Sequence, residues 1–412
     1  MGDLEALPAV RGLRGRRAGR EAGGLRAALR PLSASPPWRV AATTLIAYVA
    51  MVVPPITANG IDSLVRVGRV LVAKSDRSAR ISNLHASARI GYDGQYAYFI
   101  ALDPLQARYY MDRPSYRYGR VLYPAAAWVA ALGRPGALPY TLLAVNLLAI
   151  VGTVYLLAGF LRRREASPWW AAVYGFSPAL LICVLNDLTE PLAYFLAACG
   201  LLLLERSPNR PLRAAGLFAL AALARETTLV FPLIAAGALA LRGHSRGRLD
   251  RSSIRAAGLL LLISTAPYVA YRYALDQWLG TGIQEVGLTP VPFGGFAKWP
   301  FDQTHVLVLL TVIVPGVVWL ALSAWATVRS RVTFALALVA ANAALFVVWL
   351  PPDVYENFGS AARALIGLSL AAVLAYPSLL RFSRPRGPIV VGALMLLTIG
   401  WATVAAGVAA LV

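Results

Sequence analysis

Charged residues are scarce in this chain of 412 residues. Only 14% of its residues are charged and 58% are hydrophobic, whereas a soluble domain has about 25% charged and about 45–50% apolar residues. Apolar runs of roughly 17–25 residues, the length that crosses a bilayer as a helix, recur along the sequence. Because backbone groups in lipid must be paired within the protein, continuous runs of this length predict membrane-spanning helices.

Lysine, cysteine and histidine are rarer still. Lys74 and Lys298 are the only lysines, and the two cysteines, Cys183 and Cys199, lie inside apolar runs. They indicate neither a disulfide framework nor a metal site, and the three histidines are scattered without ligand spacing. No phosphate-binding or dinucleotide-binding glycine motif occurs. ATP-driven and nicotinamide chemistry are therefore unsupported, and we predict no resident metal or cofactor.

The net charge of +20 comes almost entirely from arginine. The arginines punctuate the apolar runs, as membrane-topology signals do, and form no basic stripe with interleaved aromatics. We therefore expect membrane lipids and no nucleic acid as partners. Residues 1–37 read as a disordered, basic cytoplasmic tail, because eight arginines precede Val40. Residues 38–412 form the predicted transmembrane domain.

The apolar runs predict an all-α polytopic membrane protein with about eleven transmembrane helices. The expected spans are Val40–Ile56, Leu138–Leu161, Trp169–Leu185, Pro191–Leu204, Leu212–Ala224, Thr227–Leu241, Ile254–Ala274, Val306–Val328, Val332–Leu350, Ala362–Leu380 and Ile389–Val412. With the N-terminus inside, this threading puts every short arginine-rich connection on the cytoplasmic side of the plasma membrane and the C-terminus outside.

The first connection, residues 57–137, is the longest and is predicted to be extracytoplasmic. Within it, Val121–Leu132 is apolar but too short to cross comfortably, and counting it as a span would place Arg162–Arg164 outside. We interpret it as a re-entrant or interfacial helix. A long connection that is not a linker is usually functional.

Polar residues, most of them ionisable, gather at the outer ends of the predicted spans. Such groups are costly at membrane depth and are functional hypotheses by default. The outer set comprises Asp93, Asp103, Asp112, Arg117, Arg120, Asn186, Asp187, Glu190, Arg225, Glu226, Asp353, Glu356, Asn357 and Arg363.

Asp93 has two structural alternatives to a functional role. It could cap a helix that starts at Gly94, since aspartate is favoured at that position, or it could pair with Arg89 one turn earlier. The flanking glycines, Gly91 and Gly94, instead favour a turn that presents the carboxylate.

The other candidates have structural alternatives too. Asp187 and Glu190 could cap the helix that follows them, and Arg225 and Glu226 could neutralise each other. Arg363 precedes an apolar run and could extend to lipid headgroups, while Arg117 and Arg120, each beside a tyrosine, could be interfacial anchors.

The order of one span, a long outer loop with an early aspartate, many spans and a late outer arginine resembles the GT-C class of integral membrane glycosyltransferases. The segment Tyr92-Asp93-Gly94-Gln95-Tyr96 is similar to the Tyr-Asp-Gly-aromatic segment of bacterial mannosyltransferase-like members. Tyr116–Pro124 and Leu223–Leu229 also look like segments of such proteins. The chain departs from the Asp-Glu pair of several members, because Gly94 follows Asp93.

The resemblance implies a polyprenyl-phosphate sugar donor, a glycan, lipid or protein acceptor on the outer face, and inversion in one displacement. An acceptor hydroxyl needs a carboxylate base, and a departing phosphate needs fixed cationic donors such as arginine. The roles expected are Asp93 as base, Arg363 with Arg120 or Arg225 on the phosphate, and Asp187, Glu190, Tyr92, Gln95 and Glu226 on the sugar or acceptor. The alternative is a lipid or solute transporter or flippase, although no internal repeat and no matched pair of broken spans is evident.

Overall fold

The fold is all-α within the part of the chain that the structure describes. The computed structural model describes residues 35–69, 91–207, 210–242, 250–280, 282, 288–329, 333–382, 392, 393 and 395. These residues contain no β-strand, only an isolated bridge between Val67 and Gly91. The predicted tail and the last predicted span, Ile389–Val412, lie almost wholly outside the described residues.

The longer helices coincide with the predicted apolar runs. They are α2 (Pro37–Asn59), α7 (Leu138–Arg163), α9 (Pro178–Leu185), α10 (Glu190–Arg206), α11 (Pro211–Ala224), α12 (Val230–Arg242), α13 (Arg251–Leu279), α15 (Val314–Val328), α16 (Phe334–Ala343) and α19 (Leu365–Phe382).

Short helices complete the described chain. They are η1 (Ile61–Leu64), α4 (Gly94–Leu102), η2 (Ala107–Tyr110), α5 (Pro114–Tyr118), α6 (Leu122–Ala130), η3 (Pro135–Ala137), η4 (Pro168–Ala171), α8 (Ala172–Gly175), η5 (Glu226–Leu229), η6 (Phe296–Lys298), α14 (Gln303–Val308), η7 (Leu309–Ile313), η8 (Ala344–Val348), α17 (Pro352–Tyr355) and α18 (Phe358–Arg363).

Helix length does not support the predicted count of about eleven spans. Among the described residues, five helices are long and apolar enough to cross a membrane, or six if one bent pair forms a single span. The stretches Pro211–Ala224, Glu226–Leu241 and Phe334–Val348 are apolar helices of only 10–17 residues. The architecture is that of an all-α membrane protein in which several predicted crossings are shortened.

Proline and charge explain why the shortened helices stop. The predicted span Trp169–Leu185 is bent by 51° between Pro168–Gly175 and Pro178–Leu185. Pro178 has no N–H to continue a helix, and Ser177 before it is extended. In the same way, Arg225 is extended and separates α11 from η5. The bend at Pro178 falls inside a predicted span, whereas the break at Arg225 lies between the two predicted spans Leu212–Ala224 and Thr227–Leu241.

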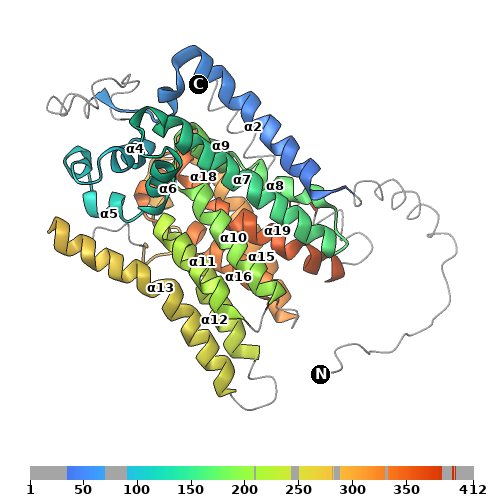
Figure 1. Ribbon diagram of the computed structural model, residues 1–412. Helices are drawn as coiled ribbons and strands as arrows, with labels where there is room; N and C mark the ends of the chain where they lie inside the picture. Colours follow the sequence, from blue (N-terminus) through green and yellow to red (C-terminus); the bar gives the residue numbers. More distant parts are fainter. Residues whose placement is uncertain are drawn as a thin grey trace, which may run out of the picture.

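The interpretation of Val121–Leu132 as a non-crossing helix agrees with the structure. α6 has nine residues, about 14 Å at 1.5 Å per residue, and hydrocarbon is about 30 Å thick. It packs against α4 and α7. Figure 1 shows α4, α5 and α6 together at one end of the bundle.

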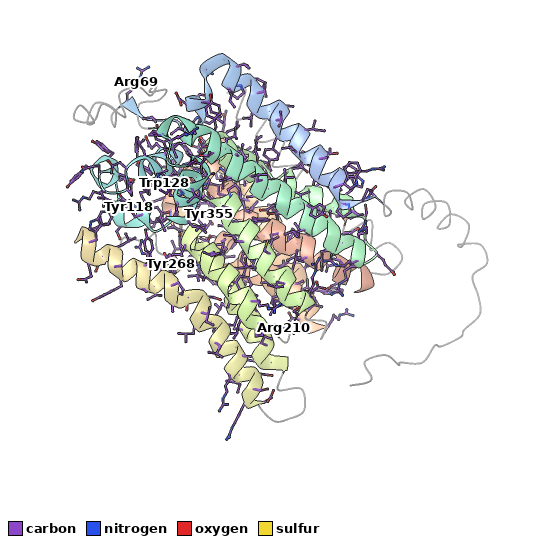
Figure 2. The ribbon with its side chains drawn as sticks, in the orientation of Figure 1. Arg69, Tyr118, Trp128, Arg210, Tyr268 and Tyr355 are labelled. Atoms are coloured by element: carbon purple, nitrogen blue, oxygen red, sulfur yellow. The ribbon has the colours of Figure 1, made fainter. Side chains whose placement is uncertain are left out.

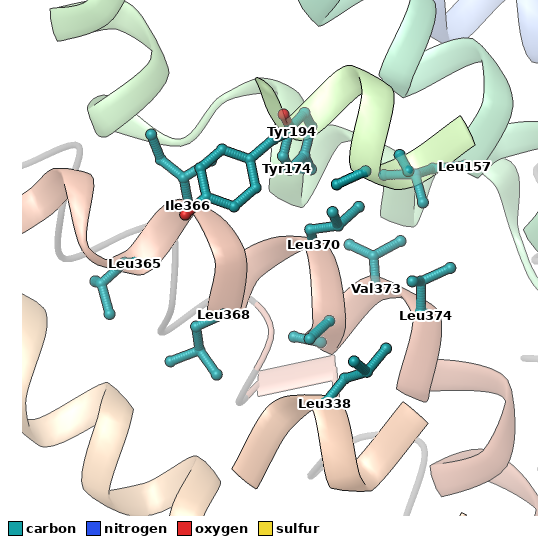
Figure 3. Packing of buried hydrophobic residues seen from close by; sticks show 14 of the residues in the cluster. Leu157, Tyr174, Tyr194, Leu338, Leu365, Ile366, Leu368, Leu370, Val373 and Leu374 are labelled. Carbon is teal, nitrogen blue, oxygen red and sulfur yellow. The ribbon is translucent and has the colours of Figure 1, made fainter. Parts of the chain in front are cut away.

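α19 forms the centre of the bundle. In its apolar window 72% of the residues are buried, against 28% in α2 and 22% in α13. Figure 3 shows leucine, isoleucine and valine side chains of α19 facing Leu157 of α7, Tyr174 of α8, Tyr194 of α10 and Leu338 of α16. α2 and α13 lie at opposite edges (Figure 1).

Candidate functional site

A cavity of about 300 Å³ lies where α4 and α5 meet the ends of α10, α11 and α18. Its polar wall consists of Asp93, Arg113, Tyr116, Arg117, Glu190, Tyr194, Arg225, Glu226, Thr227, Arg272, Asp353, Ser360 and Arg363. The remaining wall is Tyr268 of α13 with Leu288, Phe346, Leu350, Pro351, Val354 and Ala364. The cavity therefore has one charged wall and one largely apolar wall.

Helix ends position the charged wall. Glu190 is the first residue of α10 and Arg225 ends α11. A helix N-terminus favours a carboxylate and a C-terminus favours a cation, so each charge lies at the helix end that stabilises it. Arg363 is likewise the last residue of α18. Residues far apart in sequence thus bring opposite charges to one place.

The carboxylate of Asp93 forms ion pairs with two arginines and does not cap a helix. It occupies the position before α4, but its side chain makes no capping hydrogen bond. One carboxylate oxygen accepts from Arg117 at 2.9 Å and the other accepts from Arg363 at 3.3 Å. The capping alternative is therefore wrong, and the alternative partner, Arg89, lies outside the described residues.

Gly94 allows this placement. A Cβ at position 94 would lie 1.9 Å from the backbone oxygen of Asn186 and 3.2 Å from the Cβ of Asp187. Only glycine permits the start of α4 to lie this close to the turn before α10. Because position 94 has no side chain, the backbone at the start of α4 packs directly against the backbone of Asn186.

The remaining charges extend the same chain of ion pairs. Arg363 also donates to Glu190 at 3.3 Å, and Arg225 lies 3.0 Å from the same Glu190 oxygen. Arg120 donates twice to Glu226, at 2.9 and 3.2 Å. Arg225 and Glu226 approach only to 4.0 Å, so mutual neutralisation of these neighbours is a minor interaction.

We call the resulting set the ion network. It runs Asp112, Arg117, Asp93, Arg363, Glu190, Arg225, Glu226 and Arg120, with Arg117 held by both oxygens of Asp112 at 2.9 Å. Four carboxylates and four guanidinium groups cancel in charge. The cavity itself is lined by five arginines and four carboxylates, which leaves an excess of one positive charge for an anionic ligand.

The ion network sets the protonation state of Asp93. Burial would raise the pKa of its carboxyl group, but the positive charges of Arg117 and Arg363 outweigh burial and hold the pKa well below its ordinary value. Asp93 is therefore ionised while both arginines contact it.

Asp187 has the opposite environment. It is fully buried, its backbone φ is +47°, and neither carboxyl oxygen has a hydrogen-bond partner among the described residues. Burial raises the pKa of Asp187 well above its ordinary value. It lines a second cavity of about 20 Å³ with Asp93, Arg120 and Glu190, so a buried carboxyl group with a raised pKa lies directly behind the network.

The structure brings together most of the predicted site residues. Asp93, Glu190, Arg225, Glu226 and Arg363 line the larger cavity. Arg120 and Asp187 line the smaller one behind it.

Tyr92 and Gln95 line neither cavity. Gln95 is 1% exposed and accepts a hydrogen bond from the backbone of Gly68 at 3.0 Å. Tyr92 lies against Gly359, and its ring is 5.7 Å from the guanidinium of Arg363. Both residues support the site's walls in this structure.

The sequence placed Arg117 among the outer candidates without a specific role, and Arg272 was not among those candidates. Arg117 sits over the ring of Tyr96 at 4.2 Å and joins Asp93 to Asp112. Arg272, on α13, is 4% exposed, donates to the backbone oxygen of Ser115 and lines the cavity beside Tyr268. Arg272 lies inside the predicted span Ile254–Ala274, and an ionisable residue within a span indicates a functional site.

Within the described part of the chain, no three His, Cys, Asp or Glu side chains are placed to hold a metal ion. The chain matches no family model, no curated protein and no solved structure. The site is therefore interpreted from its own geometry.

The two aspartates should affect stability with opposite pH dependence. The folded-state pKa of Asp93 is lowered, so its contribution is present at neutral pH and is lost as pH falls below about 3.9, the unfolded value. Asp93→Asn should therefore cost about 1.5–3 kcal/mol at pH 7, the range for hydrogen bonds to charged groups, and less at acidic pH.

The folded-state pKa of Asp187 is raised, so its contribution is greatest at acidic pH and falls as pH rises above about 3.9. Asp187→Asn should raise the melting temperature at pH 7, and the gain should shrink towards pH 4. Thermal unfolding of the detergent-purified protein across this pH range measures both effects. Shifts in the same direction at every pH would contradict the two assignments.

Proposed function

We propose that the protein is a membrane glycosyltransferase that moves a sugar from a polyprenyl-phosphate donor to an acceptor, with inversion at the anomeric carbon. The observation that carries the proposal is the contact between Asp93 and Arg363 on the wall of the 300 Å³ cavity. It puts a carboxylate base and a phosphate-binding cation side by side. The GT-C-like order of segments in the sequence is independent support.

The two walls of the cavity suit the two parts of such a donor. Arg363, Arg225 and Arg272 offer guanidinium groups, whose planar fork matches a phosphate. Tyr268, Phe346 and Leu350 form an apolar path alongside them, where an isoprenoid chain would lie. Arg363 and Arg225 line the larger cavity and Arg120 does not, so we assign the phosphate to Arg363 and Arg225 and keep Arg120 as their support through Glu226.

The proposed reaction is a single displacement. The acceptor oxygen forms a bond to the anomeric carbon as the bond from that carbon to the donor phosphate oxygen breaks on the opposite face. The electron pair leaves with the polyprenyl phosphate, and the acceptor proton passes to Asp93. Glu190 and Glu226 are placed to accept hydrogen bonds from sugar hydroxyls, and Asp187 supports them from behind.

Donor binding would prepare Asp93 for this role. A carboxylate held by two arginines has a low pKa and is a weak base, whereas general bases work best near the operating pH. A donor phosphate competes with Asp93 for Arg363. Losing that contact raises the pKa of Asp93, so the base gains strength when the donor is in place.

The arginine distribution favours a cytoplasmic N-terminus and a site on the extracytoplasmic side of the plasma membrane. A cysteine introduced by Leu105→Cys, at an exposed position between α4 and η2 of the first loop, should react with a membrane-impermeant maleimide in intact cells. Arg213→Cys, exposed near the start of α11, should react only after the membrane is opened. The reverse pattern would place the site on the cytoplasmic side.

Asp93→Asn should separate catalysis from support of the network. Loss of a general base typically costs 10²–10⁴ in rate, so sugar transfer from a panel of polyprenyl-phosphate hexoses to cell-envelope acceptors should nearly vanish while donor binding persists. Asp112→Asn is the matched control, because Asp112 holds the same Arg117 but does not line the cavity.

Asp112→Asn should keep most of the transfer activity. Equal losses of transfer activity in the two variants would show that Asp93 has a structural and not a catalytic role. Absence of transfer by the parent protein with every donor in the panel would favour the transporter alternative.

Arg363→Gln should weaken donor use more than it weakens the fold. Losing a charge-assisted hydrogen bond costs about 1.5–3 kcal/mol, or roughly ten- to a hundredfold in donor KM. Arg363→Lys should restore only part of this, because lysine lacks the bidentate fork. Arg108→Gln is the control, since Arg108 stacks on Tyr109 and Trp278 away from the cavity. An unchanged donor KM in folded Arg363→Gln protein would remove Arg363 from the site.

A further inference from the structure

Two more cavities lie at the end of the bundle opposite the candidate site. Their volumes are about 190 and 170 Å³, and they share Arg164, Glu205 and Phe334 as lining residues. Glu205 is on α10, the helix whose first residue, Glu190, belongs to the ion network. Glu205 lies fifteen positions after Glu190, which places it about 22 Å away along the helix. Figure 2 shows Arg210, at the start of α11, far from Tyr118 and Trp128 near the site.

Both cavities have apolar walls and a charged mouth. Leu201, Leu202, Leu338 and Leu374 line the first and are buried. Leu204, Ala235, Ala238 and Leu239 line the second. Arg164 and Glu205 form an ion pair shared by the two cavities, and Phe334 lines both. Two narrow apolar spaces thus open beside one pair of charged groups.

The mouth carries excess positive charge. Arg162 and Arg163 precede Arg164 at the end of α7, and Arg206 follows Glu205. Arg162, Arg164 and Arg206 all interact electrostatically with Arg163. Against these four arginines stand Glu165 and Glu205. Basic pockets between membrane helices bind anionic lipid headgroups, and this mouth has the matching charge.

We propose that this end of the bundle binds one anionic phospholipid with two acyl chains. The headgroup phosphate contacts Arg164, and each chain enters one of the two cavities on either side of Phe334. Each cavity is smaller than the roughly 300–1,000 Å³ typical of drug-sized ligands, so each accommodates a segment of one acyl chain and the rest of that chain lies along the outer surface. The Arg164–Glu205 pair is half-exposed, with 40% and 31% of the two side chains accessible. Such pairs contribute little stability, so a phosphate can take over Arg164.

Native mass spectrometry of the full-length, delipidated protein in detergent tests the proposal. Phosphatidylglycerol should bind in preference to phosphatidylcholine with the same chains, and single-chain lysophosphatidylglycerol should bind more weakly. Soluble glycerol phosphate should not displace the lipid. Equal binding of the two diacyl lipids would overturn the headgroup assignment, and displacement by glycerol phosphate would indicate a free phosphate site.

Variants at the mouth separate lipid binding from a purely structural ion pair. Glu205→Gln frees Arg164 and should tighten phosphatidylglycerol binding. The double variant Arg164→Gln with Glu205→Gln leaves net charge unchanged and should weaken binding about fivefold, the scale of one exposed ionic contact. Arg134→Gln, an exposed residue before α7, should have no effect. Parent-like binding by both mouth variants would overturn the proposal.

Cavity-filling variants test the chains. Ala335→Phe should occupy the first cavity and Ala238→Phe the second, and each should lower the affinity for the diacyl lipid more than that for the single-chain lipid. Melting temperatures of the lipid-free variants identify those that are misfolded, for which Ala335→Leu and Ala238→Leu are the milder replacements. Unchanged diacyl binding in folded filling variants would exclude the cavities as acyl-chain sites.

Discussion

Eight charged groups of alternating sign join four separate parts of the chain at one end of the bundle. The first loop supplies Asp93, Asp112, Arg117 and Arg120, and the ends of α10, α11 and α18 supply the rest of the network. A buried charge without a partner is very costly. Each member therefore constrains its neighbours, and the loop that carries α4 and α5 is held against the helix ends by its own charges. The cavity exists because the network closes one side of it.

The charges cancel within the network, and this has a chemical consequence. Arg113 and Arg272 line the cavity outside the network, but an anion that binds Arg363 or Arg225 has to draw that arginine away from Glu190. The carboxylate that loses its arginine becomes a stronger base. Binding of an anion at Arg363 would therefore raise the basicity of Asp93, while burial of Asp187 behind the network disfavours a further negative charge there.

The sequence predicted the fold class correctly, but not the number of membrane-spanning helices. Hydrophobic runs correctly located helices from α2 to α19, because a segment in lipid must pair its own backbone. The predicted number of crossings was wrong because several of the located helices are too short to span a membrane. Pro178 bends one predicted span by 51°, whereas the extended Arg225 lies at a boundary that was expected between Leu212–Ala224 and Thr227–Leu241. Hydropathy averages over such single residues, so length and direction had to come from the packed structure.

The sequence by itself determined the chemical types at the site: carboxylates and arginines at helix ends, with Asp93 in a glycine-flanked turn. Only the tertiary structure decided the pairing. It gave Asp93 to Arg117 and Arg363, which are 24 and 270 residues away, and it gave Glu226 to Arg120 instead of the adjacent Arg225. In the packed structure Gln95 does not line the cavity but accepts a hydrogen bond from the backbone of Gly68, and Arg272 does line the cavity. The physical reason is that charge–charge energy depends on distance in space, and spatial distance is fixed only when the helices pack.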